Sequence, residues 1–457
     1  MLDTELLTQV LAAPEMLDTP ILERLRSLLG MGVLIGIAWA LSTDRRRISW
    51  SLVAWGLALQ FVFAVFILKT PVGAGLFDAA ETIVVGLLGF TLRGAEFVFG
   101  NLVYETVPVG TIGEAGFAAA PGSVARTGAV FAFSVLPTII FFSSLMAVTY
   151  HLGVMQRVVR ASAWVMQRTM KTSGAESLSA AGNVFFGQTE APLLVRPFVE
   201  KMTESELMAL MTGGFATVAG AVLAAYVGML VAYFPDVAGH MIAASVMSAP
   251  AALVVAKIML PETDEPETAN SLDVVVEKPD VNVIDAAARG AAEGLTLALN
   301  VGAMLLAFVA LIYMCNGILG WVGGLLGFEG LTLELIFGRV LAPLAWVMGV
   351  PWADAPFIGS LMGIKTVLNE FVAYLQLAGA IGETPVGVPG GLSSRSVIIA
   401  TYALSGFANF SSIAMQIAGI GGIAPSRRQD LSRLGLRAMI GGSIAAFMTA
   451  TVAGMIL

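Results

Sequence analysis

Two glutamates lie in polar stretches of a chain that is otherwise strongly apolar. Glu190 belongs to NVFFGQTEAPLLVRPF, beside Gln188 and Thr189, and Glu370 belongs to GSLMGIKTVLNEFVAYL. An ionised glutamate at the centre of a bilayer costs at least ~2.5 kcal/mol, so a glutamate kept there is a candidate for a functional role. Carboxylates accept hydrogen bonds, whereas amides and hydroxyls also donate them. The combination predicts a binding site for a polar solute.

The neighbouring side chains indicate what kind of solute would bind. No cluster of arginines accompanies the glutamates to clamp a phosphate or a carboxylate, and Phe407 offers a face on which a flat ring could stack. We therefore expect a small neutral solute rich in hydroxyl and N–H groups, such as a sugar carrying a heteroaromatic base. The uncharged hydrogen-bonding residues are Gln188, Thr189, Asn369, Asn409, Ser411 and Ser412.

Other roles for the two glutamates stay open. They could be structural, pairing with Lys365 or Arg196 to fix the backbone around them. They could also be the acid and base of an intramembrane enzyme. The sequence has no nucleophile–base arrangement, no HExxH motif and no pair of aspartates, so we predict a protein that is not an enzyme. Within transport, the alternative is a carrier or channel for another neutral solute or for ions alone.

The composition indicates an integral membrane protein whose main partner is lipid. Of the 457 residues, 57% are hydrophobic and 12% are charged, and the mean hydropathy is +0.85. Soluble domains carry roughly 25% charged residues. The net charge is −8 and no basic cluster resembles a nucleic-acid footprint. Cys315 is the single cysteine, which excludes an intrachain disulfide, and His151 and His240 lack companions at metal-ligand spacing, so neither a metal centre nor a cofactor is expected.

Apolar segments of about 20 residues predict an all-α polytopic fold. Three basic residues at 45–47 and four more between 427 and 437 place two loops in the cytoplasm, and hence both termini outside. Two further helices, 151–171 and 77–103, are expected to lie in the membrane interface, the first because its basic residues share one face. The eight predicted spans are 21–41, 48–68, 129–149, 207–234, 241–260, 295–319, 396–424 and 434–457.

The polar stretches belong to two copies of one structural unit, a hairpin followed by a helix. Residues 173–199 and about 353–380 are too polar for simple spans and too apolar for loops, and we interpret each as a re-entrant hairpin. Each precedes a helix that begins or breaks at a similar sequence, GFAT at 214–217 and GFAN at 406–409. Basic loops place the first hairpin on the cytoplasmic side and the second on the outer side, which makes an inverted repeat. Such repeats put substrate and ion sites near the midplane of the bilayer.

The same reasoning divides the chain into six parts. An acidic, proline-containing linker separates the two copies of the repeat, and further helices precede each copy. The expected parts are 1–128 (the first helices and the outer interfacial helix), 129–150 (the third spanning helix), 151–260 (interfacial helix, first hairpin and the helices that follow it), 261–290 (acidic cytoplasmic linker), 291–340 (one spanning helix) and 341–457 (second hairpin and the helices that follow it).

Four motifs in this order resemble the concentrative nucleoside transporters of the bacterial, sodium-coupled type. The resemblance covers roughly residue 129 to the C-terminus and implies a secondary active symporter. Such a protein imports nucleosides across the inner membrane by alternating access, driven by a sodium gradient. A homotrimer is also implied, in which helices one, two, three and six form a scaffold around a mobile domain that holds both hairpins. The motifs are GQTEAPLLVRP (187–197), GFATVAG (214–220), NEFVAY (369–374) and GFANFSS (406–412).

The resemblance also implies a role for each matching residue. The first hairpin and the helix after it would contact the nucleobase, and the second hairpin and its following helix would bind the ribose, with an aromatic ring beside the nucleoside. Amide, hydroxyl and carboxylate groups pair with purine and pyrimidine edges alike, so both classes of base stay open. The residues are Gln188, Thr189, Glu190 and Val222 for the base, Glu370, Asn409 and Ser412 for the ribose, and Phe407 for the ring.

The coupling ion implied by the resemblance is sodium. Its ligands would be the side chains of Asn183 and Thr217 and the main-chain carbonyls of Phe186 and Val218. Oxygen ligands at a break between two half-helices suit a hard monovalent cation. Some members of the family use protons instead, and Glu190 or Glu370 would then carry the proton.

Overall fold

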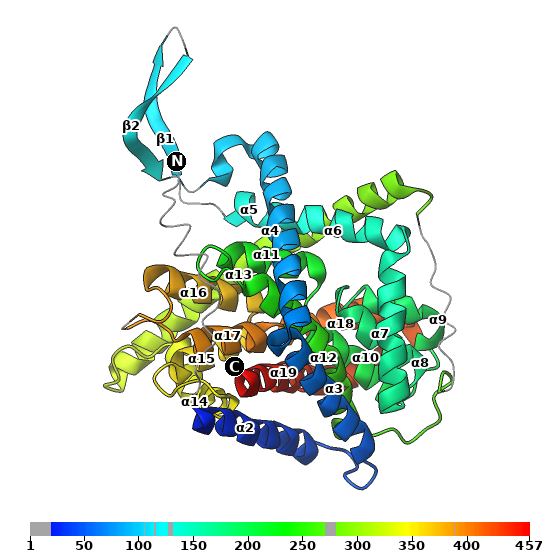
Figure 1. Cartoon of the computed structure of the whole chain (residues 1–457). Coiled ribbons are helices and arrows are strands. Elements are labelled where there is room, and N and C mark those ends of the chain that lie inside the picture. Colours follow the sequence, from blue (N-terminus) through cyan, green and yellow to red (C-terminus); the bar gives the residue numbers. More distant parts are fainter. Residues whose placement is uncertain (1–19, 105, 114–115, 127–130, 270–279, 389) are drawn as a thin grey trace.

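The computed structural model describes residues 20–104, 106–113, 116–126, 131–269, 280–388 and 390–457. Residues 270–279 of the expected linker and the first two residues of the span predicted at 129–149 lie outside this part. The described chain is almost entirely helical, which confirms the all-α fold class (Figure 1).

The first half of the chain contains the first hairpin and the first broken helix. Its helices are α2 (Ile21–Ala40), α3 (Trp50–Lys69), α4 (Pro71–Phe99), α5 (Phe131–Ser134), α6 (Leu136–His151), α7 (Val154–Met170), α8 (Gly174–Asn183), α9 (Arg196–Val199), α10 (Glu204–Ala216), α11 (Gly220–Leu230) and α12 (Val237–Met259), with the 3₁₀ turns η1 (Gly100–Val103) and η2 (Ala191–Val195).

The second half repeats the order of hairpin, broken helix and long helix. Its helices are α13 (Val283–Leu325), α14 (Leu333–Met348), α15 (Ala355–Val367), α16 (Glu370–Glu383), α17 (Ser394–Leu404), α18 (Phe410–Ile423) and α19 (Arg428–Ile456), with the 3₁₀ turn η3 (Pro425–Arg427).

Seven stretches of the described chain are long and apolar enough to cross a bilayer. One of them, Pro71–Val103, contains the segment that we expected to lie in the interface, so its placement remains a prediction. The predicted spans 207–234 and 396–424 are each broken in the middle, into α10 and α11 and into α17 and α18. Breaks of this kind are tolerated at membrane depth where the backbone is buried in protein or lines a cavity.

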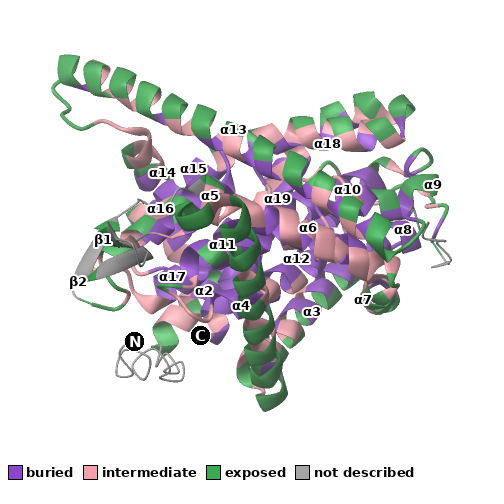
Figure 2. Ribbon diagram, turned by 90° about the horizontal axis from the view of Figure 1, so that it is seen from above, coloured by how far each residue is buried: buried purple, intermediate pink, exposed green. Residues whose placement is uncertain are grey.

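The helices form a buried centre and an exposed margin (Figure 2). In the most apolar 18-residue stretch of each segment, 89% of the residues are buried in α10–α11 and in α12, but only 17% are buried in α13. α6 packs along α13, α2 packs on α14 and α19, and α3 packs on α12. The helices α8, α10, α11 and α17 therefore lie in the most enclosed part of the molecule, whereas α18 buries only one face.

α13 is much longer than its predicted span. Its 43 residues begin at Val283, where Asn282 caps the helix by accepting bonds from Ile284 N and Asp285 N (both 2.9 Å). Arg289, inside α13, donates two hydrogen bonds of 2.6 and 3.0 Å to the carboxylate of Asp280, which lies just before the helix. These bonds hold the pKa of the Asp280 carboxyl below its usual value. The helix thus starts inside the expected linker range 261–290, because hydropathy alone misses its polar first turns.

The strands were not predicted, and α14 falls in none of the predicted spans, interfacial helices or hairpins. Strands β1 (Thr106–Gly113) and β2 (Gly116–Arg126) form an antiparallel hairpin that projects from the helical body (Figure 1). Val107 and Val109 alternate with their neighbours at the period of a strand, a signal that the sequence analysis did not use.

Candidate functional site

The two broken helices cross at their breaks. α10 ends at Ala216, and Thr217 continues in an extended conformation, so its carbonyl is free to accept a bond from Phe407 N (3.3 Å) in the other break. Gly406 has a φ of +144°, which favours glycine, and a Cβ there would lie 2.8 Å from Phe215 O. The matching GFA sequences therefore mark a close contact between two backbones.

The tip of the first hairpin lies on this crossing. Gly220 N, at the start of α11, donates to Phe185 O in the tip (3.0 Å). The Glu190 carboxylate folds back over Gly187, where an added Cβ would lie 2.1 Å from Glu190 Oε2 and 3.4 Å from Ala219 Cβ. The tip is thus in contact with the break between α10 and α11.

The tip of the second hairpin and the second break both present the start of a half-helix. Asn369 Oδ1 accepts from Val372 N (3.0 Å) and caps α16, and Asn409 Oδ1 accepts from Ser412 N (2.9 Å) and caps α18. Side-chain oxygens satisfy the free N–H groups at helix starts. Glu370 occupies the first position of α16, where the helix dipole favours a negative charge.

Glu370 is the centre of a buried hydrogen-bond network. Its Oε1 accepts from the hydroxyl of Tyr226 on α11 (2.9 Å), and its Oε2 accepts from Asn409 Nδ2 (2.9 Å). All three residues are buried. The network joins the second hairpin to both broken helices.

Gln188 ties the first hairpin to the same network. Its Nε2 donates to Ser412 Oγ (3.1 Å), and its Oε1 accepts from Gln416 Nε2 (3.1 Å). Because the backbone N–H of Ser412 is bonded to Asn409, one set of contacts runs from Gln188 to Glu370. The structure therefore brings together four predicted residues, one from each hairpin tip and two from the second broken helix.

The remaining predicted residues of the binding site lie around this network. Thr189 packs on α18, where a Cβ on Gly419 would lie 2.8 Å from its Cγ2, and it donates to Glu190 Oε1 (3.2 Å). Val222 is buried on α11, and Phe407 is half-buried in the second break.

The side chains of the predicted sodium ligands meet at Gly213. A Cβ on this glycine would lie 3.0 Å from Asn183 Nδ2, and Thr217 Oγ1 donates to Gly213 O (2.9 Å). Asn183 is buried, and neither polar atom of its amide has a hydrogen-bond partner among the described residues. An orphaned buried amide oxygen beside a hydroxyl fits a site for a hard cation. Phe186 follows Asn183 in the hairpin tip and packs its ring against Tyr150 at 5.5 Å, while Val218 is buried in the break.

The structural pairings that the sequence left open are not the ones observed. Lys365 Nζ donates to Ala403 O (2.8 Å), whereas Glu370 takes its hydrogen bonds from other residues. Arg196 is exposed. The carboxylates thus remain candidates for binding, although Lys365 lies near enough to Glu370 to interact with its charge.

Two members of the network were missed by the sequence analysis. Tyr226 lies one turn after Val222 on α11, and Gln416 lies one turn after Ser412 on α18. Residues four apart share a face of a helix. Val222 and Ser412 could therefore have indicated Tyr226 and Gln416.

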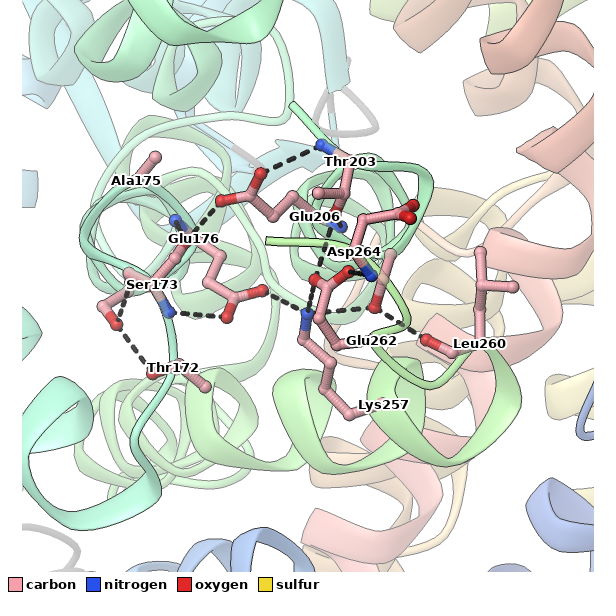
Figure 3. Close-up of polar contacts among 12 residues, drawn as sticks. Thr172, Ser173, Ala175, Glu176, Thr203, Glu206, Lys257, Leu260, Glu262 and Asp264 are labelled. Atoms are coloured by element: carbon pink, nitrogen blue, oxygen red, sulfur yellow. Dashed lines mark hydrogen bonds and ion pairs between the residues drawn. The ribbon is translucent and has the colours of Figure 1, made fainter. Parts of the chain in front are cut away.

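The base of the first hairpin is held by a second buried polar cluster, shown in Figure 3. Lys257, near the end of α12, lies 2.7 Å from Glu176 Oε2 and 3.0 Å from Glu262 Oε2, and it donates to Ser205 Oγ (2.9 Å). Lys257 and Glu176 expose only 6% and 2% of their side chains. We name these four residues, with Ser173 and Glu206, the hairpin-base cluster.

Two capping boxes complete the hairpin-base cluster. Ser173 and Glu176 cap α8, and Thr203 and Glu206 cap α10. Ser173 Oγ also donates to Glu206 Oε1 (2.5 Å), so the starts of the two helices are bonded together. Thr268 adds bonds to Gly174 N (2.9 Å) and to the next amide, which attaches the start of the linker to the hairpin.

The second hairpin is fastened in an equivalent way. Asp354 precedes α15, and its Oδ2 accepts from Ser393 N (3.1 Å), Ser393 Oγ (3.0 Å) and Ser396 Oγ (2.6 Å) at the start of α17. In both halves, therefore, the first helix of the hairpin is bonded to the first part of the broken helix.

The contact made by Lys257 also recurs, with the cation on the other helix. Lys257 is the third residue from the end of α12 and bonds to Ser205, the second residue of α10. In the second half, Arg395 is the second residue of α17 and donates to the carbonyl oxygen of Gly454 (2.6 Å), the third residue from the end of α19. These positions correspond, which supports the inverted repeat.

Comparison with known proteins identifies the family. Three family descriptions match the chain: "Na+ dependent nucleoside transporter N-terminus" over 29–102, "Nucleoside recognition" over 132–233 and "Na+ dependent nucleoside transporter C-terminus" over 240–454. An uncharacterized transporter of Haemophilus influenzae is 46% identical over 434 residues, which cover 95% of this chain and 98% of that protein. Sodium/nucleoside cotransporter 1 of Rattus norvegicus is 41% identical over 446 residues, which cover 95% of this chain and 64% of the rat protein.

Solved structures agree with these relatives. CNTnw in an inward-facing substrate-bound state matches with a TM-score of 0.83 and 45% identity, over 94% of this chain and 97% of that one. A doubly substituted CNTnw in an outward-facing state matches with a TM-score of 0.83 and 44% identity, over 95% and 97%. The resemblance drawn from four motifs is confirmed over nearly the whole length: the chain is an integral membrane protein that belongs to the Na+-dependent nucleoside transporter family.

Proposed function

We propose that the protein imports nucleosides by symport with sodium, and that it binds the nucleoside between the two hairpin tips. The observation that carries this proposal is the buried network from Gln188 to Glu370, which joins both hairpins and both broken helices. Membership of the family supports the substrate and the ion, and similar structures in inward- and outward-facing states support alternating access.

The two ends of the network suit the two ends of a nucleoside. Gln188, Thr189, Glu190 and Val222 form the end that we assign to the base. Glu370, Asn409, Ser412 and Phe407 form the end that we assign to the ribose, because a buried carboxylate is a strong acceptor for paired hydroxyls. Asn183 and Thr217, with the carbonyls of Phe186 and Val218, would hold the sodium ion that is carried with the nucleoside.

The direct test is uptake of labelled uridine into liposomes that contain the purified protein. An inward sodium gradient is compared with an inward proton gradient, each beside a control without a gradient. We expect accumulation under the sodium gradient alone. Accumulation under the proton gradient alone would retain the substrate and transfer the coupling to Glu190 or Glu370. If folded protein accumulates no uridine under either gradient, the nucleoside assignment fails.

Replacing Thr217 by valine should weaken the response to sodium. The substitution keeps the shape of the side chain but removes its oxygen from beside Asn183. Loss of one oxygen ligand, equivalent to a hydrogen bond to a charged group, should raise the sodium concentration for half-maximal uptake roughly tenfold. Sodium titrations of uridine uptake measure this.

Thr212→Val is the matched control for this titration. Thr212 is also buried on α10, and its hydroxyl has no hydrogen-bond partner within the described chain. We expect it to leave the sodium response unchanged. An unaltered response in Thr217→Val would remove Thr217 from the ion site.

We also propose that the protein is not an enzyme, that it forms a homotrimer in the inner membrane, and that both termini face the periplasm. The transporter relatives support the first statement. Large apolar side chains exposed on α13, including Leu306 and Tyr313 at 78% and 75%, are available to lipid or to a neighbouring subunit. Native mass spectrometry of the protein in detergent tests the trimer.

The family resemblance implies that α2 and α3 belong to a fixed scaffold, but one contact leads us to propose instead that α3 moves with the helices on which it packs. Gln60 on α3 is fully buried, and its amide donates to Met247 O on α12 and to Thr449 on α19 (both 3.2 Å). Such bonds favour α3 moving together with these two helices. We expect a Gln60→Cys, Thr449→Cys pair joined by a short bifunctional thiol reagent, in a Cys315→Ser background, to keep most of its uptake.

The control for this experiment joins α6 to α11, which pack against each other and would slide during transport. Cross-linking of that pair should block uptake. Loss of uptake on joining α3 to α19 would place α3 in the scaffold, as the family resemblance implies.

A further inference from the structure

Gln416 is a fully buried amide that no sequence motif singled out. It lies on α18, one turn after Ser412, and its Nε2 donates both to Gln188 Oε1 and to Met211 O, each at 3.1 Å. A primary amide nitrogen has two hydrogens, so both are used. Gln416 Oε1 has no hydrogen-bond partner within the described residues, which shows that the site is built around the nitrogen end of this amide.

The main-chain carbonyl of Met211 determines the direction of every bond in this group. A carbonyl oxygen only accepts hydrogen bonds, so Gln416 must turn its nitrogen toward Met211. The same nitrogen faces Gln188, which must therefore present its oxygen to Gln416. The Nε2 of Gln188 is then left to donate to Ser412 Oγ (3.1 Å).

The two amides are held in a narrow space against α10. A Cβ on Gly214 would lie 2.8 Å from Gln416 Nε2 and 2.9 Å from Gln188 Cβ. Glycine at this position lets both side chains lie on the helix. Since Gln416 is inaccessible to water, a solvent molecule does not take over its role.

We propose that Gln416 is a positioning residue that makes Gln188 meet the nucleobase as a hydrogen-bond donor. The inference rests on the proposed function, in which Gln188 contacts the base. Gln188 Nε2 has two hydrogens and Ser412 accepts one, so the other is available to the base. A base with an acceptor at that point, such as a carbonyl oxygen, gains a bond that a base with an amino group there does not.

The test compares nucleosides that differ in one exocyclic group and in whether the ring nitrogen beside it carries a hydrogen. Uridine has a carbonyl at position 4 where cytidine has an amino group, and inosine and adenosine differ in the same way at position 6. We expect the wild-type protein to bind the carbonyl member of each pair more tightly. Gln416→Met keeps the length of the side chain but removes both donors, and it should reduce this preference about 3- to 10-fold, the worth of one neutral hydrogen bond.

Two further measurements separate positioning from a general loss of structure. Gln416→Glu offers acceptors only, so Gln188 should turn its nitrogen toward it and the preference should reverse. The ratio of uridine to 2′-deoxyuridine affinity should stay constant in both variants, because Glu370 binds at the other end. Gln376→Met, which changes a half-buried amide on α16, is the control and should keep the wild-type preference.

The outcomes that would overturn the proposal are specific. If Gln416→Met weakens both members of each pair equally, or alters neither ratio by more than threefold, Gln416 does not orient Gln188. Thermal melting of each purified variant shows whether it is folded, and the Glu variant repeats the test if the Met variant is not. Failure of the proposed function itself would be seen earlier, as a wild-type protein that binds none of the four nucleosides.

Discussion

Replacing Glu370 by alanine should reduce uridine uptake to less than a tenth of the wild-type rate in protein that still folds and inserts. The carboxylate accepts from Tyr226 and Asn409 in the buried network, and alanine offers no acceptor in its place. Hydrogen bonds to a charged group contribute about 1.5 to 3 kcal/mol each. Losing two of them to the ribose corresponds to a fall in affinity of roughly 100-fold or more.

Two variants make this experiment specific. Glu383→Ala removes an exposed carboxylate from the last turn of the same helix, α16, and should transport normally. Glu370→Gln keeps the shape of the side chain but removes its charge, and its uptake should fall between those of the wild type and the alanine variant. Uptake by Glu370→Ala above a tenth of the wild-type rate would count against a direct contact between Glu370 and the ribose.

Replacing Lys257 by methionine should produce the largest loss of stability. The change leaves Glu176 buried with no cation beside it. Breaking a buried ion pair by removing one partner costs about 3 to 5 kcal/mol, which for a chain of this size corresponds to a fall in melting temperature of roughly 3 to 5 °C. Thermal unfolding of the protein in detergent measures this.

A second substitution tests the cause of that loss. Adding Glu176→Gln to Lys257→Met removes the uncompensated charge and should restore at least half of the lost melting temperature. Lys201→Met is the matched control, because Lys201 pairs with Glu267 at the surface (2.9 Å), with exposed fractions of 67% and 45%. Exposed pairs contribute about 0 to 1 kcal/mol. Equal shifts for Lys257→Met and Lys201→Met would show that the hairpin-base cluster does not stabilise the fold.

The features that the sequence predicted are those with a local signature. The hairpins combine polar residues with proline inside apolar chain, and the helix breaks carry the repeated GFA sequence, so both could be located without a structure. The residues that we propose for binding came from the same short motifs. Hydropathy, by contrast, reports only the length of an apolar segment. The span predicted from it at 295–319 is therefore shorter than α13, and the breaks inside the spans 207–234 and 396–424 were not visible in it.

The features that were missed depend on contacts between distant segments. Tyr226 and Glu370 are 144 residues apart, and Gln188 and Gln416 are 228 apart. Nothing local distinguishes a tyrosine or glutamine that completes a binding site from one that packs in an apolar helix. Lys257 was likewise missed, since its importance comes from carboxylates on two other segments.

The recurring contact between the end of one long helix and the start of a broken helix bears on the ancestry of the two halves. If both halves descend from one duplicated segment, the cation moved from one helix to the other after the duplication, while the contact itself was retained. Lys257 and Arg395 are then alternative solutions to one requirement, each matched to its own partner. A recombinant that pairs the helix carrying Lys257 (α12) with the helix carrying Arg395 (α17) would place two positive charges together. A recombinant that pairs their two partner helices, α10 and α19, would have no cation at this contact. A single helix of one half therefore cannot replace its counterpart in the other half without breaking this contact, and this barrier would preserve the inverted architecture while the sequences diverge.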